Sequence, residues 1–139
     1  MAAALSAKKR LSELLPGEDA ERYITLLERE SAPGGVLRQC VHRGFGRIRF
    51  SEDLTGIEYM NRFTGPFAGS GIRFLPYTAA LEVFLDRRLL SVGPLIGRRR
   101  LSFDHLILAS GCYERSFQSL TAAGTRPSGI YTAGEAQYL

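Results

Sequence analysis

The chain has 139 residues, of which 45% are hydrophobic and 23% charged, and its formal net charge is +4. This length corresponds to about one domain at ~150 residues per domain, and the composition is that of a folded chain rather than a disordered one. No stretch approaches the ~18 consecutive apolar residues that a membrane-spanning helix requires, so no membrane span is expected. Cys40 and Cys112 are far apart and fit no disulfide framework or metal-ligand spacing, which favours a reducing, cytoplasmic location without a metal site.

The first part of the chain is expected to form a helix followed by a strand. Residues 2–15 are rich in Ala, Leu and Lys, which are strong helix formers, and the helix should end at Pro16. No Ser, Thr, Asp or Asn precedes this helix, so its first amides lack a side-chain cap. Residues 23–28 are largely apolar on both faces, which is typical of a buried parallel strand, and they end at Glu28.

A loop and a second helix are expected next. Residues 38–49 are rich in Gly and Arg and indicate a loop. Residues 55–68 favour a helix, although Gly65 and Pro66 should break or shorten it, because proline lacks an amide donor and clashes with the preceding turn.

The second half of the chain is expected to consist mainly of strands. They cover residues 72–75, 79–84, 88–92, 98–103, 104–109 and 129–134. The run at 104–109 is apolar and indicates a buried strand, and the strands before it indicate hairpins. The order helix, strand, helix and then strands predicts an α/β fold with an inserted antiparallel β-ribbon.

Three features could serve a nucleotide cofactor. An acidic residue at the tip of a strand, such as Glu28, can accept hydrogen bonds from ribose hydroxyls. Gly34 and Gly35 lack side chains, so a cofactor could approach their backbone closely. Residues 106–111 form an apolar run that ends in small residues, where a ligand could lie against the backbone. The simpler interpretations are a solvated carboxylate for Glu28 and an ordinary turn for Gly34 and Gly35.

The order of these segments resembles a known family. Residues 26–40, LLERESAPGGVLRQC, resemble the second strand and following loop of FAD-dependent oxidoreductases with two dinucleotide-binding domains. Residues 104–115 are similar to the "ATG" strand of that family, with Ser110 where Thr is usual, and residues 129–137 are similar to its strand before the NAD(P)H domain. The resemblance is closest to pyridine-nucleotide-disulfide-reductase-like flavoproteins related to the α-type subunits of sarcosine and opine oxidases.

This resemblance implies that residues 1–139 form an incomplete, Rossmann-like FAD/NAD(P)-binding domain. The first strand and its G-x-G-x-x-G turn are absent, and we expect the chain to be truncated on both sides. In the complete protein, FAD would exchange hydride with NAD(P)H or with an amine or hydroxy substrate. We expect this chain alone to bind FAD weakly or not at all and to be inactive, and a second chain could supply the missing elements.

The family also implies which residues bind the adenosine half of FAD. Glu28 would bind the ribose, and Arg29 would flank the adenine. Ala80 falls on the strand whose backbone meets the adenine edge.

Further positions are implied along the path toward the flavin. Gly34, Gly35 and Arg38 would line the channel toward the pyrophosphate and the flavin. A last group lies where the chain leaves the sheet and would pack against the cofactor or follow in the same loop. This group comprises Ala109, Ser110, Gly111 and Arg115.

No catalytic residue can be named from the sequence. A disulfide-reductase mechanism is disfavoured because Cys40 and Cys112 are not close in sequence, and each is expected to be a small buried residue. His105 lies inside the expected strand at 104–109 and is expected to be structural. His42 has no neighbouring group that would give it a catalytic role.

The alternative is a non-catalytic basic fragment that binds a partner chain or an anionic ligand such as nucleic acid. Residues 98–100 are three consecutive arginines, and further arginines lie at 87–88 and within 38–49. No aromatic residues are interleaved with them in an RNA-binding pattern, and charge on an edge strand commonly prevents aggregation. Nucleic-acid binding is therefore not expected.

Overall fold

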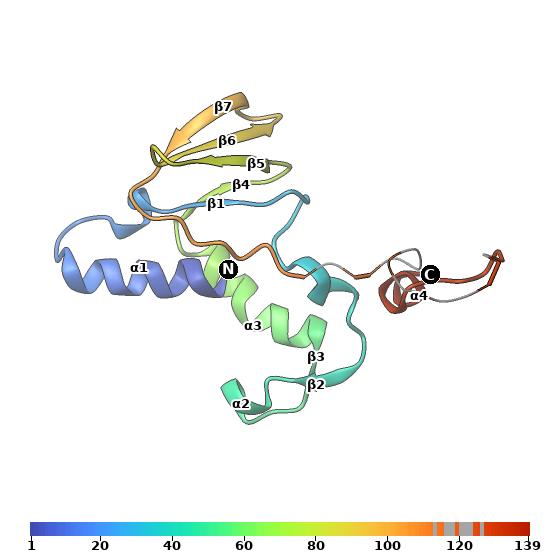
Figure 1. The fold of residues 1–139 in the computed structure, drawn as a ribbon. Coiled ribbons are helices and arrows are strands. Elements are labelled where there is room, and N and C mark those ends of the chain that lie inside the picture. Colours follow the sequence, from blue (N-terminus) through green and yellow to red (C-terminus); the bar gives the residue numbers. More distant parts are fainter. Residues whose placement is uncertain (113, 116–118, 120–123, 126) are drawn as a thin grey trace. The chain divides into compact units, whose positions relative to one another are not determined.

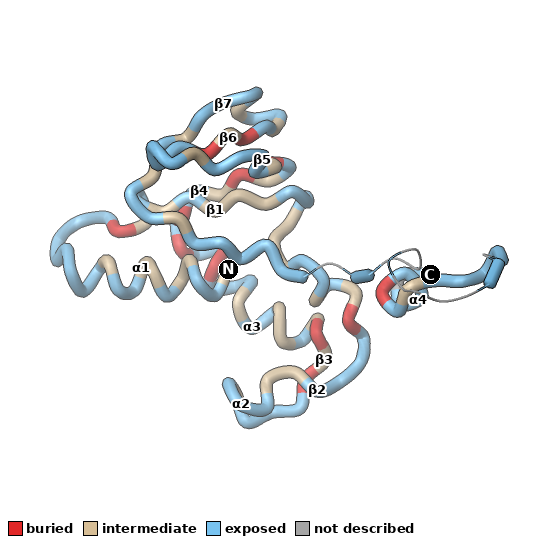
Figure 2. Tube along the Cα trace, viewed as in Figure 1, coloured by how far each residue is buried: buried red, intermediate tan, exposed pale blue. Residues whose placement is uncertain are grey.

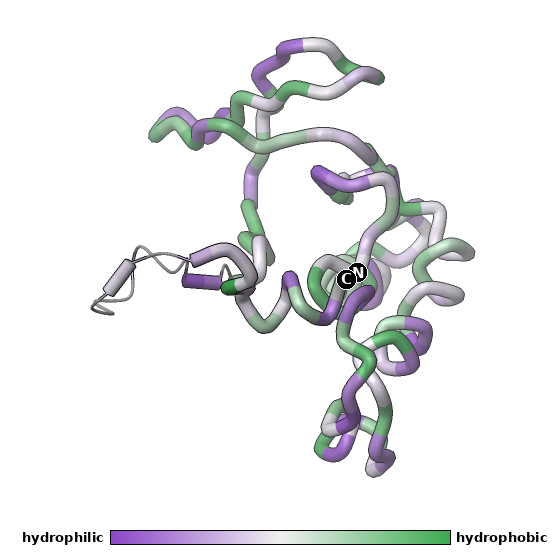
Figure 3. Tube along the Cα trace, turned by 90° about the vertical axis from the view of Figure 1, so that its right-hand side faces the viewer, coloured by the Kyte–Doolittle hydropathy of each residue, from purple (hydrophilic) through white to green (hydrophobic). Residues whose placement is uncertain are grey.

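A computed structural model describes residues 1–112, 114–115, 119, 124–125 and 127–139, and it is a mixed α/β structure with small sheets (Figure 1). The chain divides into two compact units. The first unit comprises Met1–Gly34 and Arg62–Ala109, and the second comprises Gly35–Asn61 and Ser110–Leu139. No helix in the described part of the chain is long and apolar enough to cross a membrane, as the mixed hydropathy in Figure 3 illustrates.

The first unit contains a helix and a parallel strand pair. Helix α1 spans Ala2–Leu14, and no side chain caps its N-terminus, as the sequence predicts. The one-turn helix η1, Ala20–Tyr23, leads into strand β1, Thr25–Leu27. Strand β1 pairs in parallel with β4, Arg73–Leu75, so that the backbones of the two strands end at the same edge. The parallel strand expected at 23–28 is therefore confirmed, but it is shorter and only partly buried.

An antiparallel ribbon follows in the same unit. It consists of β5, Ala79–Phe84, then β6, Arg88–Gly93, and finally β7, Gly97–Ser102, in the order β5-β6-β7. Each turn is short, so each strand pairs with its neighbour in sequence (Figure 1). This confirms the predicted ribbon.

The core of the first unit is small. Its buried apolar side chains come from η1, the end of α3, β4 and β6, and Figure 2 shows buried segments between exposed ones. They belong to Ala20, Phe67, Ile72, Leu75 and Leu89. Phe67 and Phe74 contact each other edge to face, with ring centroids 5.9 Å apart.

The second unit is built from short elements. These are η2, Gly35–Gln39, then β2, Arg43–Phe45, then α2, Arg47–Phe50, and β3, Leu54–Thr55. Strands β2 and β3 pair antiparallel, so the predicted loop at 38–49 contains regular structure. At the far end of the sequence, this unit includes helix α4, Ala133–Tyr138.

Helix α3, Gly56–Ala68, runs through Gly65 and Pro66 without a break, which corrects the expected interruption. The steric conflict of proline with the residue before it involves that residue's Cβ, and glycine has none. Thr55 and Glu58 form a capping box at its start, where the Glu58 carboxylate accepts from the Thr55 amide at 2.8 Å and Thr55 Oγ1 accepts from the Glu58 amide at 3.2 Å.

Two expected strands are absent. Residues 104–109 form no strand, and Ile107 and Leu108 are 62% and 76% exposed. A buried parallel strand needs hydrogen-bonding neighbours, and no described segment pairs with this one. At 129–134 the chain turns into α4, because Thr132 and Glu135 form a capping box that favours a helix.

Candidate cofactor site

Glu28 directly follows β1 at the edge where the parallel strands end. Its amide donates to the Leu75 carbonyl at 3.1 Å, and its own carbonyl accepts from the Thr78 amide at 2.8 Å. The carboxylate oxygen Oε1 accepts from the Glu30 amide at 3.1 Å. The backbone of Glu28 is therefore fixed on both sides, and its half-buried carboxylate is oriented by a local turn.

The N-terminus of α1 lies at the same edge. Partial burial lowers the pKa of the Met1 amino group below its usual value of 8.0, and the nearby Glu28 carboxylate opposes this shift. Because α1 runs away from this edge and β1 returns to it, the positive end of the helix dipole and the Glu28 carboxylate lie on one side of the unit.

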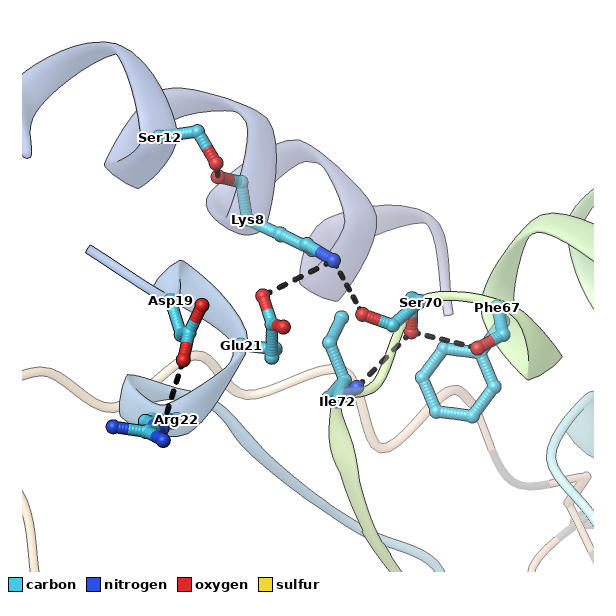
Figure 4. Close-up of polar contacts among 8 residues, drawn as sticks. All are labelled: Lys8, Ser12, Asp19, Glu21, Arg22, Phe67, Ser70 and Ile72. Carbon is cyan, nitrogen blue, oxygen red and sulfur yellow. Dashed lines mark hydrogen bonds and ion pairs between the residues drawn. The ribbon is translucent and has the colours of Figure 1, made fainter. Parts of the chain in front are cut away.

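The position of α1 is held by one lysine (Figure 4). Lys8 Nζ forms an ion pair with Glu21 Oε2 at 3.2 Å and also donates to the Ser70 carbonyl. Ser70 is buried, and its hydroxyl donates to the Phe67 carbonyl at 2.6 Å and accepts from the Ile72 amide at 3.2 Å (Figure 4). These bonds connect α1 to η1 and to the segment that enters β4.

The Glu21 carboxylate is ionised more readily than an ordinary glutamate. A hydrogen bond from its own backbone amide lowers its pKa from the ordinary value of 4.5, and the hydrogen bond from Lys8 lowers it further. Gly71 lies against this carboxyl, because a Cβ at Gly71 would be 3.2 Å from Glu21 Cγ. A side chain at position 71 would therefore crowd the Glu21 carboxyl, and the φ of 72° at this position favours glycine.

The other residues that were expected to bind the adenosine, Arg29 and Ala80, are more exposed than Glu28. Arg29 is exposed, and its Nε lies 3.3 Å from Glu30 Oε1. Ala80 is exposed on β5 opposite Ser91, next to an irregularity in the pairing with β6. Gly34 has a φ of 135°, which is a conformation that favours glycine.

Several expected residues belong to the second unit. Gly35 opens η2 with a φ of 55°, and Arg38 is exposed near the end of η2. The remaining ones follow the segment at 104–109, in which Ala109 is exposed and which forms no strand. They are Ser110, Gly111 and Arg115, all exposed. The strand that was expected to lead into these small residues is therefore not formed, and their expected contact with a cofactor stays a prediction.

Of the two cysteines and two histidines, only Cys40 is buried. Cys40 is buried, as expected, and its Sγ donates to the Val36 carbonyl at 3.3 Å. Cys112 is exposed in a segment without regular structure, which corrects the expectation that it is buried. His105 is also exposed rather than held inside a strand. Among the residues with described positions, no group of His, Cys, Asp and Glu could hold a metal ion.

His42 belongs to an aromatic cluster in the second unit. Its ring centroid lies 5.3 Å from that of Phe45, and its Nδ1 lies 3.3 Å from Gln137 Nε2. Phe45 in turn is 6.2 Å from Tyr59 between ring centroids. These contacts give His42 a packing role.

Sequence reasoning missed the residues that join Glu28 to the ribbon. Thr78 is only 2% exposed, and its amide is the donor to Glu28 described above. Tyr77 precedes it with a φ of 51°, which is uncommon for a residue with a side chain. Gly93 lies against Thr78, since a Cβ at Gly93 would be 2.4 Å from Thr78 Oγ1. The only sequence signal was the Pro76 that precedes this turn.

Comparison with known proteins adds no relative: no family model, no curated protein and no solved structure matches this chain. The site is therefore described by its own geometry, in which Glu28 and the N-terminus of α1 share one edge of the parallel strand pair.

Proposed function

We propose that this chain forms the adenosine end of an FAD site in an FAD-dependent oxidoreductase with a Rossmann-like cofactor domain. The observation that carries the proposal is the shared edge, where the uncapped N-terminus of α1 lies near the carboxylate of Glu28. Dinucleotides bind at the edge formed by the carboxyl ends of parallel strands, with their phosphates at a helix N-terminus and a ribose at an acidic residue.

Glu28 has the chemistry that this role requires. Its Oε1 already accepts from the Glu30 amide, and no described donor binds Oε2. A carboxylate with a free oxygen can accept hydrogen bonds from ribose hydroxyls, and such charge-assisted bonds are stronger than neutral ones. The backbone bonds of Glu28 to Leu75 and Thr78 limit the movement of this carboxylate before a ligand binds.

Helix α1 supplies the complementary charge. Its first turn contains no acidic residue and its N-terminus has no side-chain cap, so the first amides remain available to an anion. The ion pair of Lys8 with Glu21 keeps the helix in place. In the proposed complex these amides would face the FAD pyrophosphate, while Glu28 holds the adenosine ribose.

The flavin, when bound, supplies the hydride chemistry and would exchange hydride with NAD(P)H or with an amine or hydroxy substrate. The residues of this chain would bind and orient the adenosine half. The sequence contains no G-x-G-x-x-G turn, so few backbone amides surround the pyrophosphate. We therefore infer that a second chain supplies that part of the site and that this chain by itself binds FAD weakly.

A titration with ADP-ribose and with FAD tests the proposal. We expect calorimetry or ligand-observed NMR to give a Kd of about 0.1–1 mM, which corresponds to about −4 to −5.5 kcal/mol. Glu28→Ala should remove this binding, whereas Glu30→Ala should retain it, because Glu30 engages Glu28 through its backbone amide. Equal binding by the Glu28→Ala variant would refute the assignment of the ribose site.

The strength of binding tests the role of a second chain. Sub-micromolar binding of FAD to the isolated chain would contradict the inference that part of the site is supplied elsewhere. Co-purification of a yellow complex with a second chain from the native cell would support it, since oxidised flavin is yellow. A colourless complex would contradict it.

A further inference from the structure

The outer edge of β7 lies outside the candidate cofactor site and carries a cluster of exposed arginines. Strand β7 pairs with β6 on one side and with no described strand on the other. Its sequence is GRRRLS, and Arg98, Arg99 and Arg100 are all exposed. None of the three forms an ion pair with a described carboxylate.

A shallow hollow lies beside this edge. Its volume is about 320 Å³. It is lined by Glu82, Phe84, Leu90, Arg98, Arg99 and Arg100. The register places Arg98 and Arg100 on the face of Leu90 and Glu82, so two guanidinium groups, one carboxylate and an apolar floor border the hollow. The excess of positive charge favours binding of an anionic group, and Phe84 and Leu90 form an apolar surface that can contact an apolar side chain.

The register explains how the hollow forms. Arg100 stands opposite Leu90, and Leu90 stands opposite Glu82, so these three side chains share one face of the ribbon. Leu89 and Ser91, which point to the other face, are buried. The face with the hollow is therefore the outer face of the ribbon, and the other face packs inward.

Arg100 is held in place by an aromatic ring. Its guanidinium carbon lies 4.8 Å from the centroid of the Phe84 ring, which is a cation–π distance. This contact orders the guanidinium group beside the strand edge.

We propose that the β7 edge binds an acidic, extended segment of a partner protein by strand addition. The exposed backbone of β7 would hydrogen-bond to the added strand, and consecutive acidic side chains would pair with Arg98, Arg99 and Arg100. An apolar side chain next to the acidic run would enter the hollow above Leu90. A second copy of this chain does not fit, because two β7 strands would place arginines opposite arginines.

Fluorescence anisotropy of the full chain with a labelled peptide tests the proposal. The peptide contains three consecutive glutamates flanked by valines, and its control carries N-methyl groups on alternate amides. We expect the unmodified peptide to bind, with affinity that falls as salt rises. N-methylation should weaken binding at least about tenfold, because it removes the backbone hydrogen bonds of strand addition.

Two charge-matched variants locate the binding surface. The double variant Arg98→Glu/Arg100→Glu should weaken peptide binding at least about tenfold. The double variant Lys9→Glu/Arg22→Glu changes the net charge equally, on α1 and η1, and should bind as the parent does. Arg98→Gln/Arg100→Gln should also weaken binding, and circular dichroism should show that it retains the strand content of the parent.

Three results would overturn the proposal. One is an equal loss of binding in the two charge-reversed variants, which would indicate attraction by net charge alone. Another is unchanged binding of the N-methylated peptide, which would exclude strand addition. The third is tighter binding of a single-stranded oligonucleotide of equal charge, which would assign the arginines to nucleic acid.

Discussion

The β5–β7 ribbon and the segment at 104–109 are both predicted as strands from the sequence, but only the ribbon forms strands in the structure. The ribbon forms as expected, with each strand bonded to its neighbour in sequence. The segment at 104–109 contains an apolar run at 106–109, yet it forms no strand and exposes Ile107 and Leu108. The difference lies in where the partner strand comes from. A hairpin brings its partner within a few residues, whereas a parallel strand needs a partner from a distant part of the chain.

The parallel pair β1–β4 is intermediate, because it forms a regular pairing although its two strands are far apart in sequence. Each strand contributes three residues to the pairing. It is held by the buried side chains of Ile72 and Leu75 and by the attachment of α1 through Lys8. Tertiary contacts therefore support this pair, while the ribbon is supported mainly by its own turns.

The largest expected effect comes from the core of the parallel pair. Leu75→Ala should reduce the free energy of unfolding by about 2–5 kcal/mol, because Leu75 is only 4% exposed and truncation leaves a cavity. Hydrogen exchange should show faster exchange in β1 and β4, with smaller changes in β6 and β7. The control Leu85→Ala, in an exposed turn, should change stability by less than about 0.5 kcal/mol. Equal loss of protection in the ribbon would show that the two regions are not distinct.

The junction between ribbon and parallel pair should give the next largest effect. Gly93→Ala would place a Cβ 2.4 Å from Thr78 Oγ1 and 3.0 Å from the Tyr77 carbonyl, and we expect it to cost about 1–3 kcal/mol in thermal or denaturant unfolding. Gly69→Ala is the matched control, since the Cβ there meets its nearest atom at 3.8 Å. If both variants have the same free energy of unfolding, the close approach of Gly93 to Thr78 does not contribute to the stability of this junction.

The attachment of α1 should give a small, pH-dependent effect. Because the pKa of Glu21 is lowered in the folded chain, its ionisation stabilises the fold above pH 4.5, and this stabilisation is lost as the pH falls through the folded pKa. Glu21→Gln should therefore lower the unfolding temperature slightly at pH 7 and converge with the parent in acid. A difference between the two proteins that stays constant down to pH 3 would contradict this mechanism.

The smallest effect is expected in the segment at 104–109. Leu108→Ser should change the free energy of unfolding by less than about 0.5 kcal/mol, because Leu108 is 76% exposed and no strand surrounds it. Leu89→Ser in β6 is the comparison, since Leu89 is buried, and it should be strongly destabilising. A large loss in Leu108→Ser would mean that this segment is buried in solution as a strand.

Elements whose causes are local can be predicted from the amino-acid sequence. Helix α1 and the three ribbon strands follow from propensity, turn residues and alternation, and all four are found where they were predicted. The position of Glu28 at the end of a parallel strand was also predictable, because an apolar run ends there. Helix α4 was missed although its capping pair, Thr132 and Glu135, has a recognisable spacing.

The tertiary structure decided the elements that need a distant partner. An apolar run such as residues 104–109 satisfies the pattern of a buried strand, but the backbone groups of a strand must be paired by neighbours that the run itself does not contain. The meeting of Glu28 with the N-terminus of α1 likewise depends on the return of β1 beside β4, and on Lys8 holding α1 to Glu21 and Ser70. Local sequence placed a carboxylate at the end of β1 and left the start of α1 without a side-chain cap, and the packing of distant segments brought the two to one edge.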